Sequence, residues 1–127
     1  MNIAHRICPD LKTYAAAQKF CETAAMNGFK TGRLVEPKTQ SFNDKVYAEA
    51  RVSFGFRSFW MGITAKGGAW VYASSGTKIG FENWYKFIKS KNQKVKSGKK
   101  KCVSSSDGKW INHRCNNNWI NFICEFV

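Results

Sequence analysis

The chain of 127 residues is long enough for one domain with a modest core, and its 43% hydrophobic content excludes a disordered protein. No run of eighteen apolar residues occurs, which excludes a transmembrane helix, and the first residues lack the apolar stretch of a secretory signal peptide. The net charge of +13 indicates acidic partners, such as sulfated or sialylated glycans, anionic lipid, mineral or nucleic acid; the alternative is simple solubility.

Five cysteines in a chain this small indicate disulfides and an oxidising, extracellular compartment. A metal site is the alternative, but there is no Cys-x-x-Cys motif, and His5 and His113 make no ligand pattern. An odd count leaves one thiol over, and Cys8, beside Pro9 near the terminus, is the obvious one. We interpret Cys8 as an interchain link in a disulfide-linked dimer; a free thiol, or pairing with a segment missing here, is the alternative. Cysteines of the secreted type also argue against a nucleic-acid partner.

Two helices are predicted in the first half, after a short extended arm at residues 1–12. Thr13 is the expected N-cap of the first helix, which runs to about Met26 and ends at Asn27-Gly28. Its buried stripe, at helical spacing, is Tyr14, Ala17, Cys21 and Ala24. After Pro37, Ser41 is the expected cap of a second helix, with one apolar face formed by Phe42, Val46 and Ala50.

Short strands are predicted after Arg51. The first lies within residues 54–63, where Gly55 and Gly62 interrupt an aromatic run. A strand at 69–72 lies between turns at Gly67-Gly68 and 74–76, and closing strands are predicted at 102–103, 110–111 and 122–126. Two helices followed by short strands around one long loop predict an α+β domain.

Residues 81–101 show no convincing periodicity, and a loop this long in a compact domain is usually functional or mobile. Eight lysines and no acid occur between Lys86 and Lys101. By default this run is a solvated cationic loop; it becomes functional where the ligand is a polyanion.

Taken in order, several motifs resemble those of a C-type lectin-like domain over residues 8 to 127. A first helix carries Cys21, and the later motifs are Trp60-Met61-Gly62-Ile63, Trp70-Val71-Tyr72, Phe81-Glu82-Asn83-Trp84, Cys102-Val103, Trp110-Ile111-Asn112, Cys115 and Phe122-Ile123-Cys124-Glu125. The resemblance implies a single domain, residues 1–127, with two helices packed on short antiparallel sheets and a long binding loop. It also implies the disulfides Cys21–Cys124 and Cys102–Cys115, which leaves Cys8 over.

Sugar-binding members of this family hold Ca²⁺ through a tripeptide in the long loop, a later acid and a W-N-D motif. The matching positions here are Lys89-Ser90-Lys91, then Lys100, then Ile111-Asn112. Calcium needs six to eight oxygen ligands, and lysine has no acceptor to offer. We therefore expect no calcium at the usual sugar site and no other cofactor.

A substitute mechanism uses ammonium and amide groups as donors to sugar hydroxyls or an acetamido carbonyl. Asn116 to Asn118 offer further amides, and Trp84, Trp110 or Trp119 could pack a sugar face. The sequence resembles invertebrate, bivalve-type members that lack the calcium tripeptide, and this resemblance implies GlcNAc or GalNAc as ligands. The predicted carbohydrate-binding residues are Lys89, Ser90, Lys91, Asn92, Tyr85, Lys100, Asn112 and His113.

Several of these residues also have a purely structural interpretation. Trp60, Trp70, Trp84 and Trp110 are expected in the core, whereas Trp119 could lie in or out of it. His113 could be an ordinary turn residue, and His5 is expected to be exposed and uninvolved.

An enzyme is not expected, because only eight acids occur and no nucleophile, metalloprotease or phosphate-loop motif is present. The alternative to a lectin is a cationic protein of the same fold that binds acidic polymers, mineral matrix or microbial surfaces.

Overall fold

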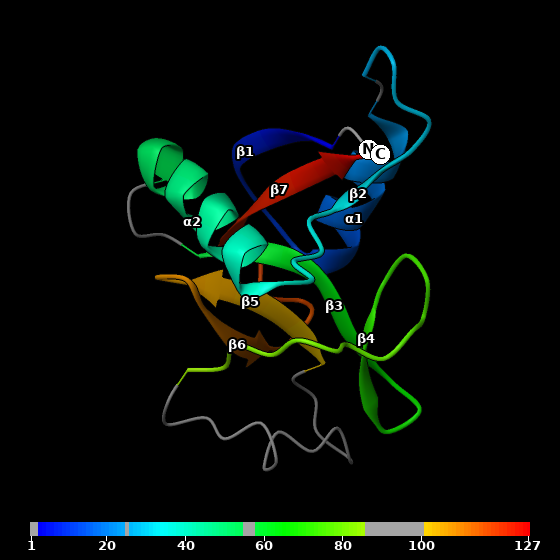
Figure 1. Ribbon diagram of the computed structural model, residues 1–127, viewed down its shortest axis with the longest axis vertical. Helices are drawn as coiled ribbons and strands as arrows, with labels where there is room; N and C mark the ends of the chain where they lie inside the picture. Colours follow the sequence, from blue (N-terminus) through cyan, green and yellow to red (C-terminus); the bar gives the residue numbers. More distant parts are fainter. Residues whose placement is uncertain (1–2, 25, 55–57, 86–100) are drawn as a thin grey trace.

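The computed structural model describes residues 3–24, 26–54, 58–85 and 101–127. Figure 1 shows two helices against a curved sheet, which confirms the predicted α+β class. The elements are β1 (Ala4–Lys12), α1 (Tyr14–Thr23), β2 (Gly32–Leu34), α2 (Gln40–Phe54), β3 (Phe59–Lys66), β4 (Ala69–Tyr72), β5 (Cys102–Ser106), β6 (Lys109–His113) and β7 (Ile120–Phe126). Among the described residues, no helix has the length and apolar character needed to cross a membrane.

The C-terminal strand β7 lies inside the sheet, whose order is β1-β7-β3-β5-β6, with β2 beside β7 and β4 beside β3. All seven residues of β7 are buried, including the polar Asn121 and the charged Glu125. β1 pairs antiparallel with β7 from Ala4 opposite Phe126, so the two termini lie side by side (Figure 1). Strand β3 runs parallel to β7, and the β5–β6 hairpin continues the sheet toward the far end.

The N-terminal arm is therefore a strand in the sheet, which corrects the expectation for His5 and bears on the one for Cys8. His5 was expected to be exposed, but its side chain is only 10% exposed and its Nδ1 lies 3.1 Å from Glu49 Oε2 on α2. Cys8 is 4% exposed, and burial raises the pKa of its thiol. A bond to a second chain needs an accessible thiolate, so both facts count against the interchain link, which stays a prediction.

Helix α1 begins as predicted, with the Thr13 hydroxyl accepting from Ala16 N at 3.3 Å. It ends at Thr23 rather than at Met26, because Ala24 already has an extended backbone. Gly28 then takes the left-handed conformation, with φ of +87°, expected for the end of this segment.

Helix α2 begins at Gln40, and its cap is Thr39 rather than Ser41. The Thr39 hydroxyl accepts from Phe42 N at 3.2 Å, which satisfies a first-turn donor. The helix reaches Phe54, which was expected to begin a strand. Its inward side matches the predicted face, since Val46 and Ala50 are buried and Phe42 packs against the core.

Gly62 does not interrupt β3, although the sequence suggested a break there. A Cβ at this position would lie 2.8 Å from Leu34 O and 2.8 Å from Glu36 Cγ. The glycine therefore lets β3 approach the segment after β2 closely.

Two disulfides have the pairings that the resemblance implied. Cys21–Cys124 joins α1 to β7 across 103 residues, and Cys102–Cys115 joins β5 to the turn after β6 across 13 residues. Four of the five tryptophans are buried, which confirms the expected core positions Trp60, Trp70, Trp84 and Trp110. Trp119 is the exception, at 82% exposed.

Candidate functional site

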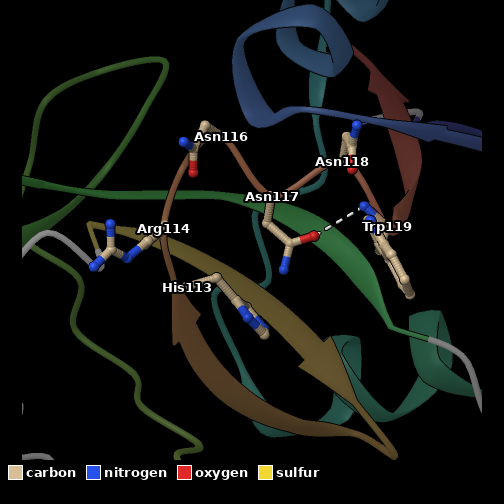
Figure 2. A pocket seen from close by; sticks show the side chains of 6 residues that line it. All are labelled: His113, Arg114, Asn116, Asn117, Asn118 and Trp119. Carbon is tan, nitrogen blue, oxygen red and sulfur yellow. Dashed lines mark hydrogen bonds between the residues drawn. The ribbon is translucent and has the colours of Figure 1, made fainter.

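The turn between β6 and β7 forms a shallow pocket, which we call the 113–119 pocket. Its volume is about 450 Å³, and its lining residues are His113, Arg114, Asn116, Asn117, Asn118 and Trp119 (Figure 2). A volume of this size is typical of a small-ligand site. The lining comes from one continuous segment, so the pocket depends on how that segment is held.

The framework fixes this turn at several points. The Cys102–Cys115 disulfide ties it to β5, and Cys115 O accepts from Tyr14 N at 3.1 Å, which anchors it to the start of α1. Within the turn, Arg114 O accepts from Asn117 N at 3.1 Å. These bonds hold the pocket's shape before any ligand arrives, which lowers the ordering cost of binding.

Trp119 and Asn117 are held in one arrangement by a hydrogen bond from Trp119 N to Asn117 Oδ1 at 2.8 Å (Figure 2). Because a backbone N–H can only donate, the Asn117 oxygen must face it. The Asn117 amide nitrogen is therefore left on the pocket side, where Figure 2 shows it turned toward His113. The pocket presents a donor beside an exposed aromatic ring.

His113, one of the predicted site residues, is a fixed wall of this pocket. Its Nε2 lies 2.7 Å from Ser104 Oγ on β5, and its ring packs edge-on against Trp60 at a centroid distance of 5.8 Å. His113 is thus the last residue of β6 rather than an ordinary turn residue, and its contact with a sugar stays a prediction.

Tyr85 and Asn112, also predicted, are not among the residues that line the pocket. Tyr85 N donates to Trp110 O at 3.0 Å, so Tyr85 runs along β6, and its side chain is half-buried. Asn112 lies in β6 opposite Val103 and precedes His113 directly. The structure thus brings both residues to the strand that leads into the pocket.

Five other predicted residues lie outside the described part of the chain, and their roles stay predictions: Lys89, Ser90, Lys91, Asn92 and Lys100. The predicted set omitted Arg114 and Trp119 and treated residues 116–118 only as possible amides. The signal for them was the run Asn-Asn-Asn-Trp directly after Cys115, which places polar groups and an aromatic ring in a disulfide-bounded turn.

The described residues do not fit a calcium ion. Within these ranges, no group of three or more His, Cys, Asp or Glu side chains could hold a metal. The pocket itself offers amides, an imidazole, a guanidinium and an indole, with no carboxylate. Calcium sites combine neutral carbonyl oxygens with several anionic carboxylate oxygens, and this pocket offers only neutral amide oxygens beside a guanidinium cation.

A second pocket, of about 430 Å³, lies where the termini meet, and its charged groups are already paired. Arg33 Nε donates to Glu125 Oε2 at 2.7 Å. Glu36 accepts from the backbone N and the hydroxyl of Ser74, both at 2.9 Å. The carboxylates of Glu36 and Glu125 are fully buried, so this network holds the fold together.

Comparison with known proteins gives a family match over nearly the whole chain. Residues 10–126 match the model described as "Lectin C-type domain". No curated protein sequence matches.

Similar solved structures include the C-type lectin CEL-I from Cucumaria echinata, 16% identical with a TM-score of 0.82, covering 100% of this chain and 91% of that one. Human lithostathine is 24% identical with a TM-score of 0.77, covering 99% and 84%. The cow C-type carbohydrate-recognition domain of CD23, determined in the presence of a GlcNAc2Man3 oligosaccharide, is 19% identical with a TM-score of 0.75, covering 98% and 88%. At these identities the likeness shows the fold.

Proposed function

The chain belongs to the C-type lectin domain family, and on this premise we propose that it is a calcium-independent lectin for N-acetylhexosamines. The observation that carries the proposal is the exposed Trp119, held beside Asn117 in a disulfide-braced pocket without carboxylates. Asn112 and Tyr85 lie along the strand that leads to this pocket. The loop residues Lys89–Asn92 and Lys100, which lie outside the described part of the chain, belong to the proposal on the resemblance alone.

Each pocket group has a physical role toward such a sugar. The face of Trp119 can pack against the apolar face of a hexose or the N-acetyl methyl group, and it is 82% exposed before binding. The Asn117 amide nitrogen can donate to the acetamido carbonyl, since its oxygen is occupied by Trp119 N. The amides of Asn116 and Asn118 can exchange hydrogen bonds with hydroxyls.

The donor set, rather than the fold, supports the proposal of calcium independence. The pocket has no carboxylate, and the loop positions that match the family's calcium ligands carry Lys89-Ser90-Lys91 and Lys100. An ammonium group placed there is a fixed positive charge with three donors, which can serve sugar oxygens directly. The oligosaccharide present with the similar cow CD23 domain is in line with a ligand that contains N-acetylated sugars.

The test is a calorimetric titration of the whole protein with GlcNAc and GalNAc, once in EDTA and once in calcium. Glucose and galactose, which lack the acetamido group, serve as matched controls. We expect equal affinities in the two buffers and weaker binding of the controls. Loss of binding in EDTA would refute calcium independence, and no binding of any sugar in either buffer would refute the lectin function.

A second candidate function rests on the net charge of +13. A cationic protein of this fold could bind acidic polymers, mineral matrix or microbial surfaces through many weak charge contacts. Such binding falls steeply with added salt and ignores neutral sugars. Retention on a sulfated polymer, eluted by salt and unaffected by GlcNAc, would favour this function.

An extracellular location and a dimer through Cys8 accompany the proposal. The two disulfides suit an oxidising compartment. The dimer requires β1 to release a thiol that is 4% exposed. Electrophoresis without reductant decides it: a species of twice 14.5 kDa supports the link, and a single 14.5 kDa band contradicts it.

A further inference from the structure

The 113–119 pocket supplies more hydrogen-bond donors than acceptors. Arg114 has donors only, and the one carbonyl oxygen of the Asn117 side chain is occupied by Trp119 N. None of the six lining residues is acidic, and the sequence from Gly108 to Cys124 contains no Asp or Glu. A ligand that matches this pocket must therefore bring acceptors.

Arg114 is an exposed cation, and no carboxylate of the described residues lies within ion-pair distance of it. Arg33 shows the contrast, because its side chain is 20% exposed and bonds Glu125 at 2.7 Å. The Arg114 guanidinium therefore keeps its full donor capacity for a partner from outside.

We propose that the 113–119 pocket prefers an N-acetylated sugar that also carries an acidic group, a carboxylate or a sulfate, with Arg114 as the partner of the anion. The inference rests on the proposed function, since it names the sugar class for the same site. A neutral sugar brings hydroxyl protons that need acceptors, whereas a carboxylate or sulfate brings acceptors alone. Charge-assisted hydrogen bonds to a guanidinium are shorter and stronger than neutral ones.

The layout of the turn sets where the two parts of such a ligand lie. Figure 2 shows Arg114 extending to one side of the turn and Trp119 lying at the other, with Asn117 between them. The sugar ring and acetamido group then lie over Trp119 and Asn117, and the acidic group lies toward Arg114. The ligand's acid and its stacked face are thus at opposite ends.

The test compares pairs of sugars in which one member carries an acidic group and the other is neutral, titrated into the whole protein in EDTA. One pair is GlcNAc 6-sulfate against GlcNAc, and the other is the methyl glycoside of N-acetylneuraminic acid against its neutral methyl ester. We expect the acidic member of at least one pair to bind roughly 10- to 100-fold more tightly, the gain of charge-assisted hydrogen bonds. The pair that shows the gain tells whether the source is a sulfate or a carboxylate.

The variant Arg114→Gln keeps a polar side chain and removes the charge. It should abolish the preference for the acidic member, which is measured as the ratio of the acidic and neutral affinities within the variant. Arg51→Gln is the matched control, because it removes the same charge from an exposed position on α2. The preference should survive in this control.

Three outcomes overturn the inference. The first is that neither acidic sugar binds more tightly than its neutral partner. The second is that Arg114→Gln keeps the preference for the acidic sugar. The third is that Arg51→Gln loses this preference to the same extent, which would show a general effect of charge. Binding of GlcNAc without any acidic preference overturns this inference alone. Absence of binding by every sugar overturns the proposed function with it.

Discussion

The two pockets of this protein differ in whether their charged groups are paired. Where the termini meet, Arg33 bonds Glu125 at 2.7 Å and Glu36 is held by two bonds from Ser74, with both carboxylates buried. In the 113–119 pocket, no acid is present, and Arg114 and Trp119 are both exposed. The two pockets have similar volumes, about 430 and 450 Å³. Volume therefore does not distinguish the two pockets, whereas the pairing of their polar groups does.

The difference between the two pockets is explained by the free-energy cost of removing water from a charged group. A buried carboxylate is tolerated only where hydrogen bonds and an opposite charge replace its water, so such groups are committed to one another. An exposed guanidinium keeps its water and can exchange it for a ligand. Removing a charged residue where the termini meet should thus lower the free energy of unfolding. Removing Arg114 from the 113–119 pocket should instead weaken ligand binding.

The largest expected effect comes from the disulfides, one in each region. Replacing both Cys21 and Cys124 by alanine should lower the free energy of unfolding by about 4–5 kcal/mol, since the closed loop spans 103 residues. The same change at Cys102 and Cys115 should cost about 3 kcal/mol, because that loop spans 13 residues. Urea denaturation measures both; a larger loss for the shorter loop would contradict the ordering.

Arginine replacement tests the comparison directly. Arg33→Met leaves Glu125 buried without its partner and should destabilise the fold by about 3–5 kcal/mol. Arg114→Met, at the exposed position, should change stability by no more than about 0.5 kcal/mol. If both variants change the free energy of unfolding equally in urea denaturation, the two pockets do not differ in how their charged groups contribute to stability.

Trp119→Ala should weaken GlcNAc binding roughly tenfold, about 1.4 kcal/mol, because the sugar loses its packing surface. Stability should stay unchanged, since the side chain is 82% exposed. Trp119→Phe, which keeps an aromatic face, should retain intermediate affinity. Calorimetric titration beside thermal unfolding measures both quantities, and unchanged affinity in Trp119→Ala would remove the residue from the site.

The smallest expected effect is a pH dependence of the free energy of unfolding that comes from His5, close to where the termini meet. Burial lowers the pKa of this imidazole, but the carboxylates of Glu125 and Glu49 raise it by more, so the net pKa lies above 6.5. The Glu49 carboxylate lies 3.1 Å from His5 Nδ1, and the Glu125 carboxylate lies 3.9 Å from His5 Nε2. Glu125 is also bonded to Arg33, and the Phe42 ring packs edge-on against the imidazole.

The folded state therefore holds this proton more tightly than the unfolded chain. The stabilisation that protonated His5 gives to the folded state should be complete below the unfolded pKa of about 6.5. It should be lost as pH rises through the higher pKa of the folded state. His5→Gln should remove this fall in stability, and Glu49→Gln should reduce it. Urea denaturation from about pH 6 to pH 8 measures it, and a parallel profile for His5→Gln would exclude His5 as its source.

Much of the framework could be predicted from the sequence, because its signals are local. Helical spacing gave the buried side of α1 and the inward face of α2, and the family motifs gave the two disulfides and the four core tryptophans. The α+β class and the turn glycines at 67 and 68 followed in the same way, whereas β1 before α1 and β2 between the helices were not predicted as strands of the sheet.

What only the tertiary structure decided depends on contacts between distant segments. His5 and Cys8 are buried because β1 pairs with β7 more than a hundred residues away, which no local pattern around either residue reveals. Likewise, Trp119 is exposed and Asn117 turned toward the pocket because a disulfide and the start of α1 hold the turn between them. Sequence periodicity reports which side chains are apolar, and burial is then settled by the neighbours that the fold brings to them.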